Sequence, residues 1–233
     1  METLYICIIL IFIILIANYY WKTYEGFETE MYRLGDMIDV YNGPWSRHDK
    51  EKGFDYHIKH FPNSIATEYL LKTTKSRDYQ TLLNIINKRQ PKFYPDDTLV
   101  IHLRIGDVID ENKLDLDKIL SEYTKFGAGV NYVRPIKYYT NLIDTIHNYK
   151  IKKILLVGGF HRKGNHDKSL QYVNHIKQHF ENNGFNCTTR INHNADEDFL
   201  IMTNSKYFVP SGGRFSNVVK QMVILKGGTV IEK

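Results

Sequence analysis

The chain of 233 residues predicts an α/β fold built around a parallel sheet. From residue 96 onward, short apolar runs rich in β-branched residues alternate with longer segments whose apolar residues recur at helical spacing. Such alternation is typical of a parallel sheet covered by helices on both faces. The earlier residues lack this alternation, and Pro91 and Pro95 interrupt the chain between the two parts. We therefore expect a stem and small N-terminal lobe over residues 22–95 and a larger α/β lobe over residues 96–233.

The expected strands are short and bounded by turn residues, and they lie at 98–103, 153–157, 207–210 and 229–231. The expected helices lie at 115–123, 136–149, 169–182, 196–203 and 215–221, and helical spacing also runs through residues 64–89. Gly184 follows the helix at 169–182, in the position where glycine commonly ends a helix. In a sheet of this kind, ligands bind at the carboxyl ends of the strands, close to helix N-termini.

Residues 4–21 predict a membrane anchor. Leu4–Ala17 contains neither a charge nor a proline, and the extension to Trp21 passes the lower limit of about 17 residues for spanning a bilayer. The aromatic residues Tyr19–Trp21 suit the headgroup level. A cleaved signal peptide is the alternative, but only Glu2 precedes the apolar run, where basic residues are usual. We expect a retained, single-pass anchor of a type II protein in the endomembrane system (Golgi or ER).

The composition is that of a globular protein, with 42% hydrophobic and 24% charged residues. The net charge of +5 suits an anionic ligand such as a nucleotide diphosphate, and it is too small and too dispersed to indicate nucleic-acid binding. Cys7 and Cys187 lie far apart in the chain and imply no disulfide framework. A single glycosylation sequon at residues 186–188 is compatible with a lumenal domain.

The sharpest candidate site is the run from Ile101 to Asp107, which reads IHLRIGD. Arg104 follows the end of an expected strand, where a parallel sheet presents its ligand crevice. A guanidinium can clamp a diphosphate with two charge-assisted hydrogen bonds and stabilise the charge on a departing diphosphate. His102 and Asp107 flank it, and either could orient it. The alternative is a buried strand whose polar residues only close a turn.

A second candidate site follows the expected strand at 207–210. The turn consists of Ser211, Gly212, Gly213, Arg214, Phe215 and Ser216. A glycine turn before a helix offers backbone N–H groups to a phosphate, and Arg214 and Ser216 add side-chain donors. The alternative is an ordinary strand-to-helix turn in which Ser216 is the N-cap.

Together the two segments resemble the fucosyltransferase superfamily, which includes the α-1,2-, α-1,6- and protein O-fucosyltransferases. The pattern His-x-Arg-x-Gly-Asp at residues 102–107 is similar to a signature of that family. Asp198, the Leu-Ile-Met run at 200–202 and the turn that ends in Phe215–Ser216 resemble its last motif. Arg33–Asp36 weakly resembles the glycine turn that opens the first lobe of these enzymes.

The resemblance implies a GT-B-like, two-lobed fold with a Rossmann-type sheet and GDP-fucose as the donor. It implies inverting transfer to a glycan or protein hydroxyl, with neither a metal ion nor another cofactor. Arg104 would hold the β-phosphate with His102 beside it. Apart from the resemblance, we take Asp107 and Asp36 as the candidates for the base that deprotonates the acceptor hydroxyl. The implied donor pocket is lined by Gly35, Asp198, Ser211, Gly212, Gly213, Arg214, Phe215 and Ser216.

The sequence also departs from the family pattern. Ile105 stands where many relatives have a second arginine, the turn at 158–161 is Gly-Gly-Phe-His where many have an Asp-rich turn, and Gly213–Arg214 replaces a Ser-Ser pair. These departures favour a second hypothesis, a non-catalytic carbohydrate- or nucleotide-binding module derived from such an enzyme. A third hypothesis is an anchored assembly component with no nucleotide site.

Three weaker patterns complete the candidates. Asp115–Asp117 matches a metal-binding Asp-x-Asp, but it lies at an expected helix start, where carboxylates are favoured by the helix dipole. The glycines from Gly158 to Gly164 could form a phosphate loop, although they lack the Lys-Ser/Thr ending of a P-loop. Tyr132, with Tyr138 and Tyr139, is expected to pack in the core and between lobes rather than to bind a sugar.

Overall fold

The computed structural model describes residues 58–73, 75, 77–89, 95, 97–122, 132–160 and 164–232. All of them belong to the second of two compact units of the chain, Tyr32–Lys233. The expected anchor at residues 4–21 and the glycine turn at Arg33–Asp36, which contains Gly35, lie outside the described residues. Within the described ranges, every helix is too short or too polar to cross a bilayer.

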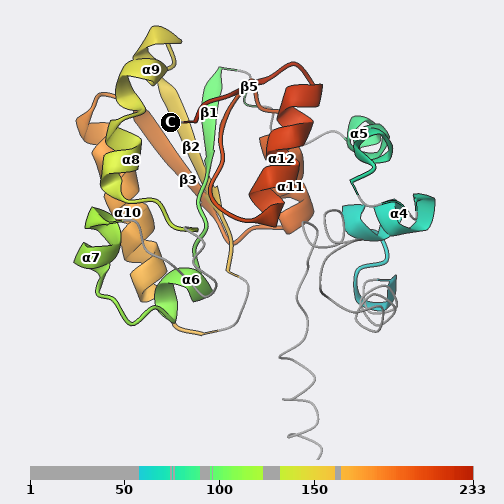
Figure 1. Cartoon of the computed structure of the whole chain (residues 1–233), viewed down its shortest axis with the longest axis horizontal. Coiled ribbons are helices and arrows are strands. Elements are labelled where there is room, and N and C mark those ends of the chain that lie inside the picture. Colours follow the sequence, from blue (N-terminus) through green and yellow to red (C-terminus); the bar gives the residue numbers. More distant parts are fainter. Residues whose placement is uncertain are drawn as a thin grey trace, which may run out of the picture. The chain divides into compact units, whose positions relative to one another are not determined.

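The centre of the described unit is a five-stranded sheet with the order β3-β2-β1-β4-β5, shown in Figure 1. The strands are β1 (Thr98–His102), β2 (Lys153–Gly158), β3 (Asn186–Ile191), β4 (Tyr207–Val209) and β5 (Thr229–Val230). All neighbouring strands run parallel, and Leu99 of β1 pairs with Ile154 on one side and Tyr207 on the other. The α/β fold with a parallel sheet, predicted from the alternation of the sequence, is confirmed.

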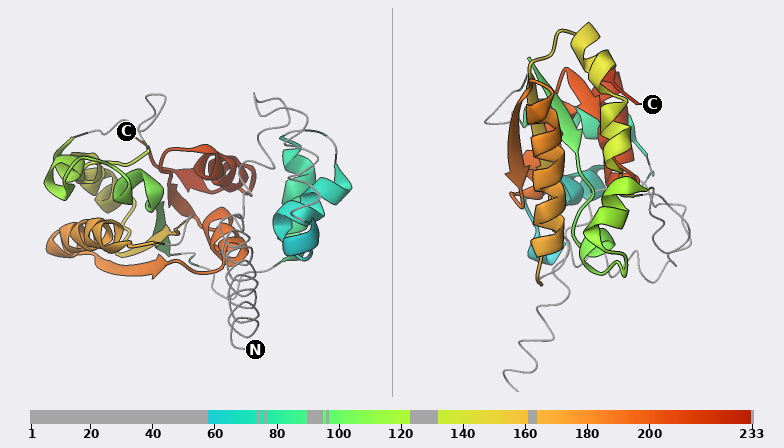
Figure 2. Two further views of the ribbon diagram at one scale, coloured as in Figure 1. Left: turned by 90° about the horizontal axis from the view of Figure 1, so that it is seen from below. Right: turned by 90° about the vertical axis from the view of Figure 1, so that its left-hand side faces the viewer.

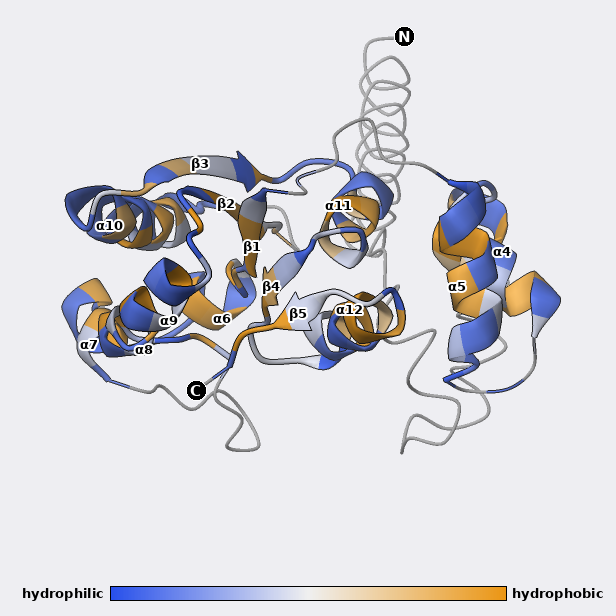
Figure 3. Ribbon diagram, turned by 90° about the horizontal axis from the view of Figure 1, so that it is seen from above, coloured by the Kyte–Doolittle hydropathy of each residue, from blue (hydrophilic) through white to orange (hydrophobic). Residues whose placement is uncertain are grey.

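Helices cover both faces of this sheet, as Figures 2 and 3 show. One face carries α6 (Asp107–Asp110), α7 (Leu116–Ser121), α8 (Ile136–Thr140), α9 (Ile143–Asn148) and α10 (Asp167–Asn182). The other face carries α11 (Ala195–Thr203) and α12 (Arg214–Leu225), and the hydrophobic cluster on this face also contains side chains of α4 (Ile65–Lys72) and α5 (Tyr79–Lys88). The apolar sides of the helices thus pack towards the sheet and its two clusters.

The two faces have separate cores because side chains alternate along β1. Leu99 and Ile101 pack on the face of α10, where Ile176 and Phe180 are fully buried. Val100 packs on the opposite face with residues of α11 and α12. A central parallel strand is buried on both faces, which explains the uninterrupted apolar run that predicted β1.

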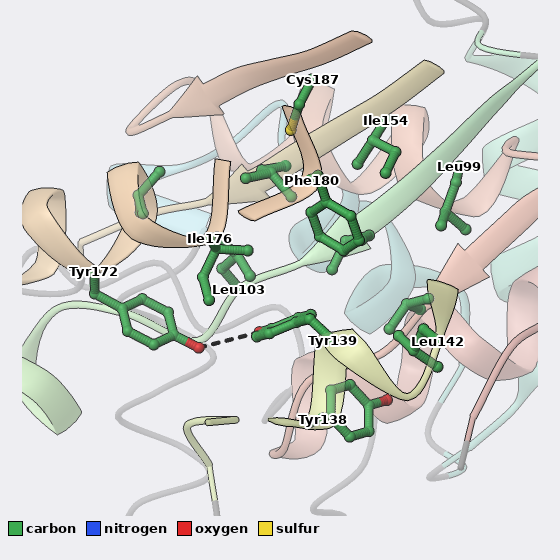
Figure 4. Packing of buried hydrophobic residues seen from close by; sticks show 14 of the residues in the cluster. Leu99, Leu103, Tyr138, Tyr139, Leu142, Ile154, Tyr172, Ile176, Phe180 and Cys187 are labelled. Atoms are coloured by element: carbon green, nitrogen blue, oxygen red, sulfur yellow. Dashed lines mark hydrogen bonds between the residues drawn. The ribbon is translucent and has the colours of Figure 1, made fainter. Parts of the chain in front are cut away.

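The core under α8 and α10 contains a buried pair of tyrosines, shown in Figure 4. The hydroxyl oxygens of Tyr139 and Tyr172 lie 3.1 Å apart, and the Tyr172 hydroxyl donates to the carbonyl of Arg134 at 2.6 Å. Burial raises the pKa of both hydroxyls, so both stay neutral and satisfy each other within an apolar core. Tyr138 and Tyr139, which the sequence assigned to the core, are both buried there, whereas Tyr172 was not predicted.

Several boundaries differ from the predictions. The apolar spacing at 64–89 contains two helices, because Thr73 is extended and Asp78 caps the second by accepting from the amide of Thr81. The expected helix at 136–149 is likewise two, α8 and α9. The short helix α6 and the strand β3 were not predicted from the sequence. Strand β3 was not predicted because only Cys187 is buried in its polar run of six residues.

Candidate nucleotide-binding site

Two loops meet at the point where the strand order changes direction, between β1 and β4. The chain leaves β1 and continues to β2 on one side, and it later places β4 on the other side of β1. The loops after β1 and β4 therefore flank the switch point, which is where parallel sheets of this type bind ligands. A buried hydrogen bond joins the loops directly, since His102 Nδ1 and Ser211 Oγ lie 2.8 Å apart.

Arg104 lies in the loop after β1 and is held by its immediate neighbours. Its Nη1 donates to the carbonyl of Ile105 at 2.6 Å, and its Nη2 lies 2.7 Å from Oδ1 of Asp107. Both side chains are 17% exposed. The second contact is an ion pair without the alignment of a hydrogen bond, and the buried Oδ1 has no aligned donor among the described residues. Asp107 thus lies where it can orient the guanidinium.

His102 ends β1 and points to the turn after β4. Its side chain is buried, and its ring centroid lies 5.3 Å from that of Phe215, at an interplanar angle of 57°. The ring of Phe215 in turn lies 5.8 Å from that of the fully buried Phe199 in α11. The rings of His102, Phe215 and Phe199 therefore pack in sequence from the site into the core. His102 also connects the two loops.

The turn from Ser211 to Ser216 is shaped by one glycine and one hydroxyl. Gly213 is the N-cap of α12 with φ +99°, a conformation that glycine adopts without strain. The alternative in which Ser216 is the N-cap is wrong, because α12 begins two residues before Ser216, at Arg214. The buried Ser216 instead accepts a hydrogen bond from the amide of Ser211 at 2.9 Å and closes the turn. The amino end of α12, with its partial positive charge, therefore faces the end of β4.

Tyr132 contacts both loops. Its ring lies 6.0 Å from the guanidinium carbon of Arg104, and its carbonyl accepts from the amide of Gly212 at 3.4 Å. A Cβ at Gly213 would lie 3.4 Å from the same ring. Arg104 and the turn at 211–216 are therefore gathered around one side chain at one edge of the sheet. The sequence assigned Tyr132 to the core and to contact between the lobes, and its partly buried ring does pack against the core cluster. No local pattern indicates its position between these two loops.

Asp198 is buried in the first turn of α11, beside Arg190 at the end of β3. Arg190 Nε donates to Asp198 Oδ1 at 2.5 Å, and Arg190 Nη2 lies 2.9 Å from Oε2 of Glu197. Burial raises the pKa of Asp198, and the neighbouring Arg190 offsets only part of that effect. A buried carboxyl group with a raised pKa is a recurrent feature of binding sites. The next residue of α11, Phe199, contacts Phe215 of the turn.

The shifted pKa of Asp198 predicts a pH effect on stability. The folded chain binds this proton more tightly than the unfolded chain, so stability falls as pH rises from about 3.8 through the raised pKa, and then levels off. We expect Asp198→Asn to be at least as stable as the wild type at neutral pH, and its advantage to vanish on acidification. Urea unfolding at several pH values measures this, with Glu197→Gln as the control. A neutral-pH loss above ~1 kcal/mol for Asp198→Asn would show that the ion pair outweighs burial.

The weaker patterns have structural roles. Asp115 is the N-cap of α7, and its side chain accepts from the amide of Lys118, so the helix-cap interpretation is confirmed. A Cβ on Gly158 would lie 2.9 Å from the carbonyl of Leu103, so this glycine allows β2 to approach the loop after β1. Burial raises the pKa of the Cys187 thiol to about 12, so the thiol is protonated at neutral pH, which is the less reactive form. The described residues contain no cluster of metal-binding side chains.

Comparison with known proteins finds similarity to solved structures. No family model matches the chain, and no curated protein matches it either. Crystal structures of POFUT1 are similar over part of their length. For a complex with GDP, the identity is 12%, the match covers 60% of this chain and 41% of that one, and the TM-score is 0.33. For a complex with GDP-fucose, these values are 13%, 78%, 55% and 0.33. The chain thus spans about half the length of these structures.

Proposed function

We propose that the chain is a glycosyltransferase that takes its sugar from a nucleotide diphosphate, with GDP-fucose as the donor. The observation that carries the proposal is the meeting of Arg104 and the amino end of α12 around Tyr132, at the switch point of the sheet. A guanidinium and the amide groups of a helix N-terminus are together suited to a diphosphate. The resemblance of residues 102–107 and 198–216 to fucosyltransferase motifs supports guanosine and fucose as the rest of the donor.

In this proposal the protein acts chiefly through charge and position. Arg104 and the amino end of α12 take up the negative charge that develops on the departing diphosphate, and the transfer is inverting and needs no metal ion. His102 and Ser211 hold the two loops at a fixed separation. Asp107 orients Arg104 through the ion pair. Asp36, the other candidate for the base, lies outside the described residues.

We also propose that the enzyme is anchored in a membrane of the Golgi or ER through residues 4–21. This part of the proposal rests on the sequence, where an uncharged apolar run precedes three aromatic residues. The acceptor would then be a lumenal glycan or a protein hydroxyl.

A non-catalytic nucleotide-binding module is the second candidate, and one observation favours it. The carboxylate of Asp107, a candidate for the base, lies 2.7 Å from the guanidinium of Arg104, and this ion pair favours a carboxylate that positions Arg104 over one that takes a proton. A chain of this kind would bind GDP and leave GDP-fucose intact.

The test uses the full chain in detergent micelles. We expect calorimetry to show saturable binding of GDP, with weaker binding of GMP because the second phosphate is missing, and we expect slow release of GDP from GDP-fucose. Binding of GDP without any release or transfer would instead support the binding module. Absence of binding and of any thermal shift with GDP, UDP and ADP would refute both candidates and favour an assembly component.

A further inference from the structure

A series of hydrogen bonds connects the loop that carries Arg104 to the amino end of α10. The amide of Gly106 donates to Oγ of Ser169 at 3.0 Å, and Ser169 is fully buried. The amide of Ser169 donates to Oδ1 of Asp110 at 2.9 Å. The second oxygen of Asp110 lies 2.8 Å from Nδ1 of His166. None of these residues other than Gly106 belongs to the motif that predicted the site.

These hydrogen bonds connect two segments that are distant in sequence, residues 106–110 and 166–169. Gly106 and Asp110 bracket α6, Ser169 lies in the first turn of α10, and His166 is the N-cap of α10. The ring of Phe160, which follows β2, stacks on His166 with centroids 3.9 Å apart and planes 12° apart. The side chains of Asp110 and His166 are only 11% and 17% exposed. The amino end of α10 is thus fixed against both ends of α6.

The position of Gly106 determines how Arg104 is held. Gly106 has φ +81° and ψ −132°, a conformation that glycine adopts without the strain that a side chain would cause, and its amide is held by the hydrogen bond to Ser169. It lies between Ile105 and Asp107, and the carbonyl of the first and the carboxylate of the second hold the guanidinium of Arg104. A shift of Gly106 would move both partners of Arg104 at once.

We propose that Ser169, supported by Asp110 and His166, is a positioning residue for Arg104 in the binding of the donor diphosphate. The inference rests on the proposed function. A different possibility is that the same hydrogen bonds only fasten α6 to α10 and contribute to stability. The two possibilities differ in one measurable respect, because a positioning residue that acts through Arg104 has nothing left to position when Arg104 is absent.

A double-mutant cycle on the full chain tests this difference. The affinity for GDP is measured by calorimetry for the wild type, Ser169→Ala, Arg104→Ala and the double variant, with GDP titrated into the millimolar range. We expect Ser169→Ala to weaken binding by roughly 5-fold in the wild-type background, the equivalent of one lost buried hydrogen bond. In the Arg104→Ala background we expect it to weaken binding by less than about 2-fold.

The control is Ser205→Ala. Ser205 is also buried, and its hydroxyl donates to the carbonyl of Met202 at 2.7 Å, but it precedes β4 at the opposite end of that strand from the site. This variant should lose stability and keep its affinity for GDP. If Ser169→Ala does not fold, Asp110→Asn replaces it, because the amide oxygen can still accept from Ser169 while the contact to His166 changes.

The outcomes separate the two proposals. Equal weakening by the Ser169 substitution in both backgrounds, or no weakening in either, would overturn the positioning role and leave the proposed function standing. Failure of the folded wild type to bind GDP would instead overturn the proposed function, and the positioning role with it.

Discussion

Replacement of Arg104 by alanine is expected to weaken the binding of GDP by roughly 10- to 100-fold, because hydrogen bonds between charged groups contribute about 1.5–3 kcal/mol. Arg104 lies at the switch point of the sheet, 6.0 Å from the ring of Tyr132 and therefore beside the amino end of α12. One Nη donates to Ile105 and the other contacts Asp107, which fixes the plane of the guanidinium. A guanidinium carries five donors, so others remain for a phosphate.

Calorimetric titration with GDP measures the effect, and thermal unfolding without nucleotide shows whether the variant is folded. Arg104→Lys should lie between the wild type and Arg104→Ala, because an ammonium keeps the charge and loses the two parallel donors. The matched control is Arg89→Ala, which removes another partly buried arginine paired with a carboxylate, that of Glu68. It should leave the affinity unchanged. Equal affinities for the wild type and a folded Arg104→Ala would remove Arg104 from the site.

The central strands were predictable because burial on both faces leaves a strong signal. Strands β1 and β2 appear in the sequence as apolar runs, and in the structure every residue of β1 and all but Lys153 of β2 are buried. Strand β3 lies at the edge of the sheet, where Thr188 and Thr189 are exposed, so no apolar run marks it. Apolar runs thus identified the interior strands and the edge strand β5, and they missed only the polar edge strand β3 among the strands of the described residues.

Helix boundaries depended on interactions that periodicity does not contain. The apolar spacing of residues 136–149 continues through Asn141 and Leu142, yet these residues separate α8 from α9. Asp78 begins α5 by accepting from the amide and the hydroxyl of Thr81, and an aspartate before a helical segment is a capping pattern that is visible in the sequence. The break between α8 and α9 carries no comparable sequence signal.

The parts of the site that could be predicted are those in which a phosphate-binding residue or glycine turn directly follows an expected strand. Arg104 and the turn at 211–216 follow strands, and strand ends in a parallel sheet form the ligand edge. The pairing of His102 with Ser211 spans 109 positions of sequence, and that of Gly106 with Ser169 spans 63. Neither pairing, nor the place of Tyr132 between the loops, has a local pattern. These contacts depend on how helices pack on the sheet, which one sequence does not specify residue by residue.

A large loss of stability is expected when the ring of Phe199, which packs against Phe215 of the turn, is removed. Phe199 of α11 is fully buried in the cluster on the face of α12, and its ring contacts that of Phe215, which in turn contacts His102. Truncation to alanine removes the ring and leaves a cavity, so Phe199→Ala should lower the free energy of unfolding by about 3–5 kcal/mol. That is a large fraction of the stability of about 5–15 kcal/mol that is usual for a domain.

Urea unfolding followed by circular dichroism measures the loss, with Leu71→Ala as the control, since Leu71 is 65% exposed and its truncation should change stability by less than ~0.5 kcal/mol. Phe199→Leu refills part of the cavity and should recover much of the loss. At a temperature where Phe199→Ala is still folded, its affinity for GDP should also fall, because Phe215 loses the ring that supports it against His102. A loss of stability without any loss of affinity would mean that the turn keeps its shape without that ring. The support of the site would then reside in the hydrogen bonds of Ser211 and Ser216 alone.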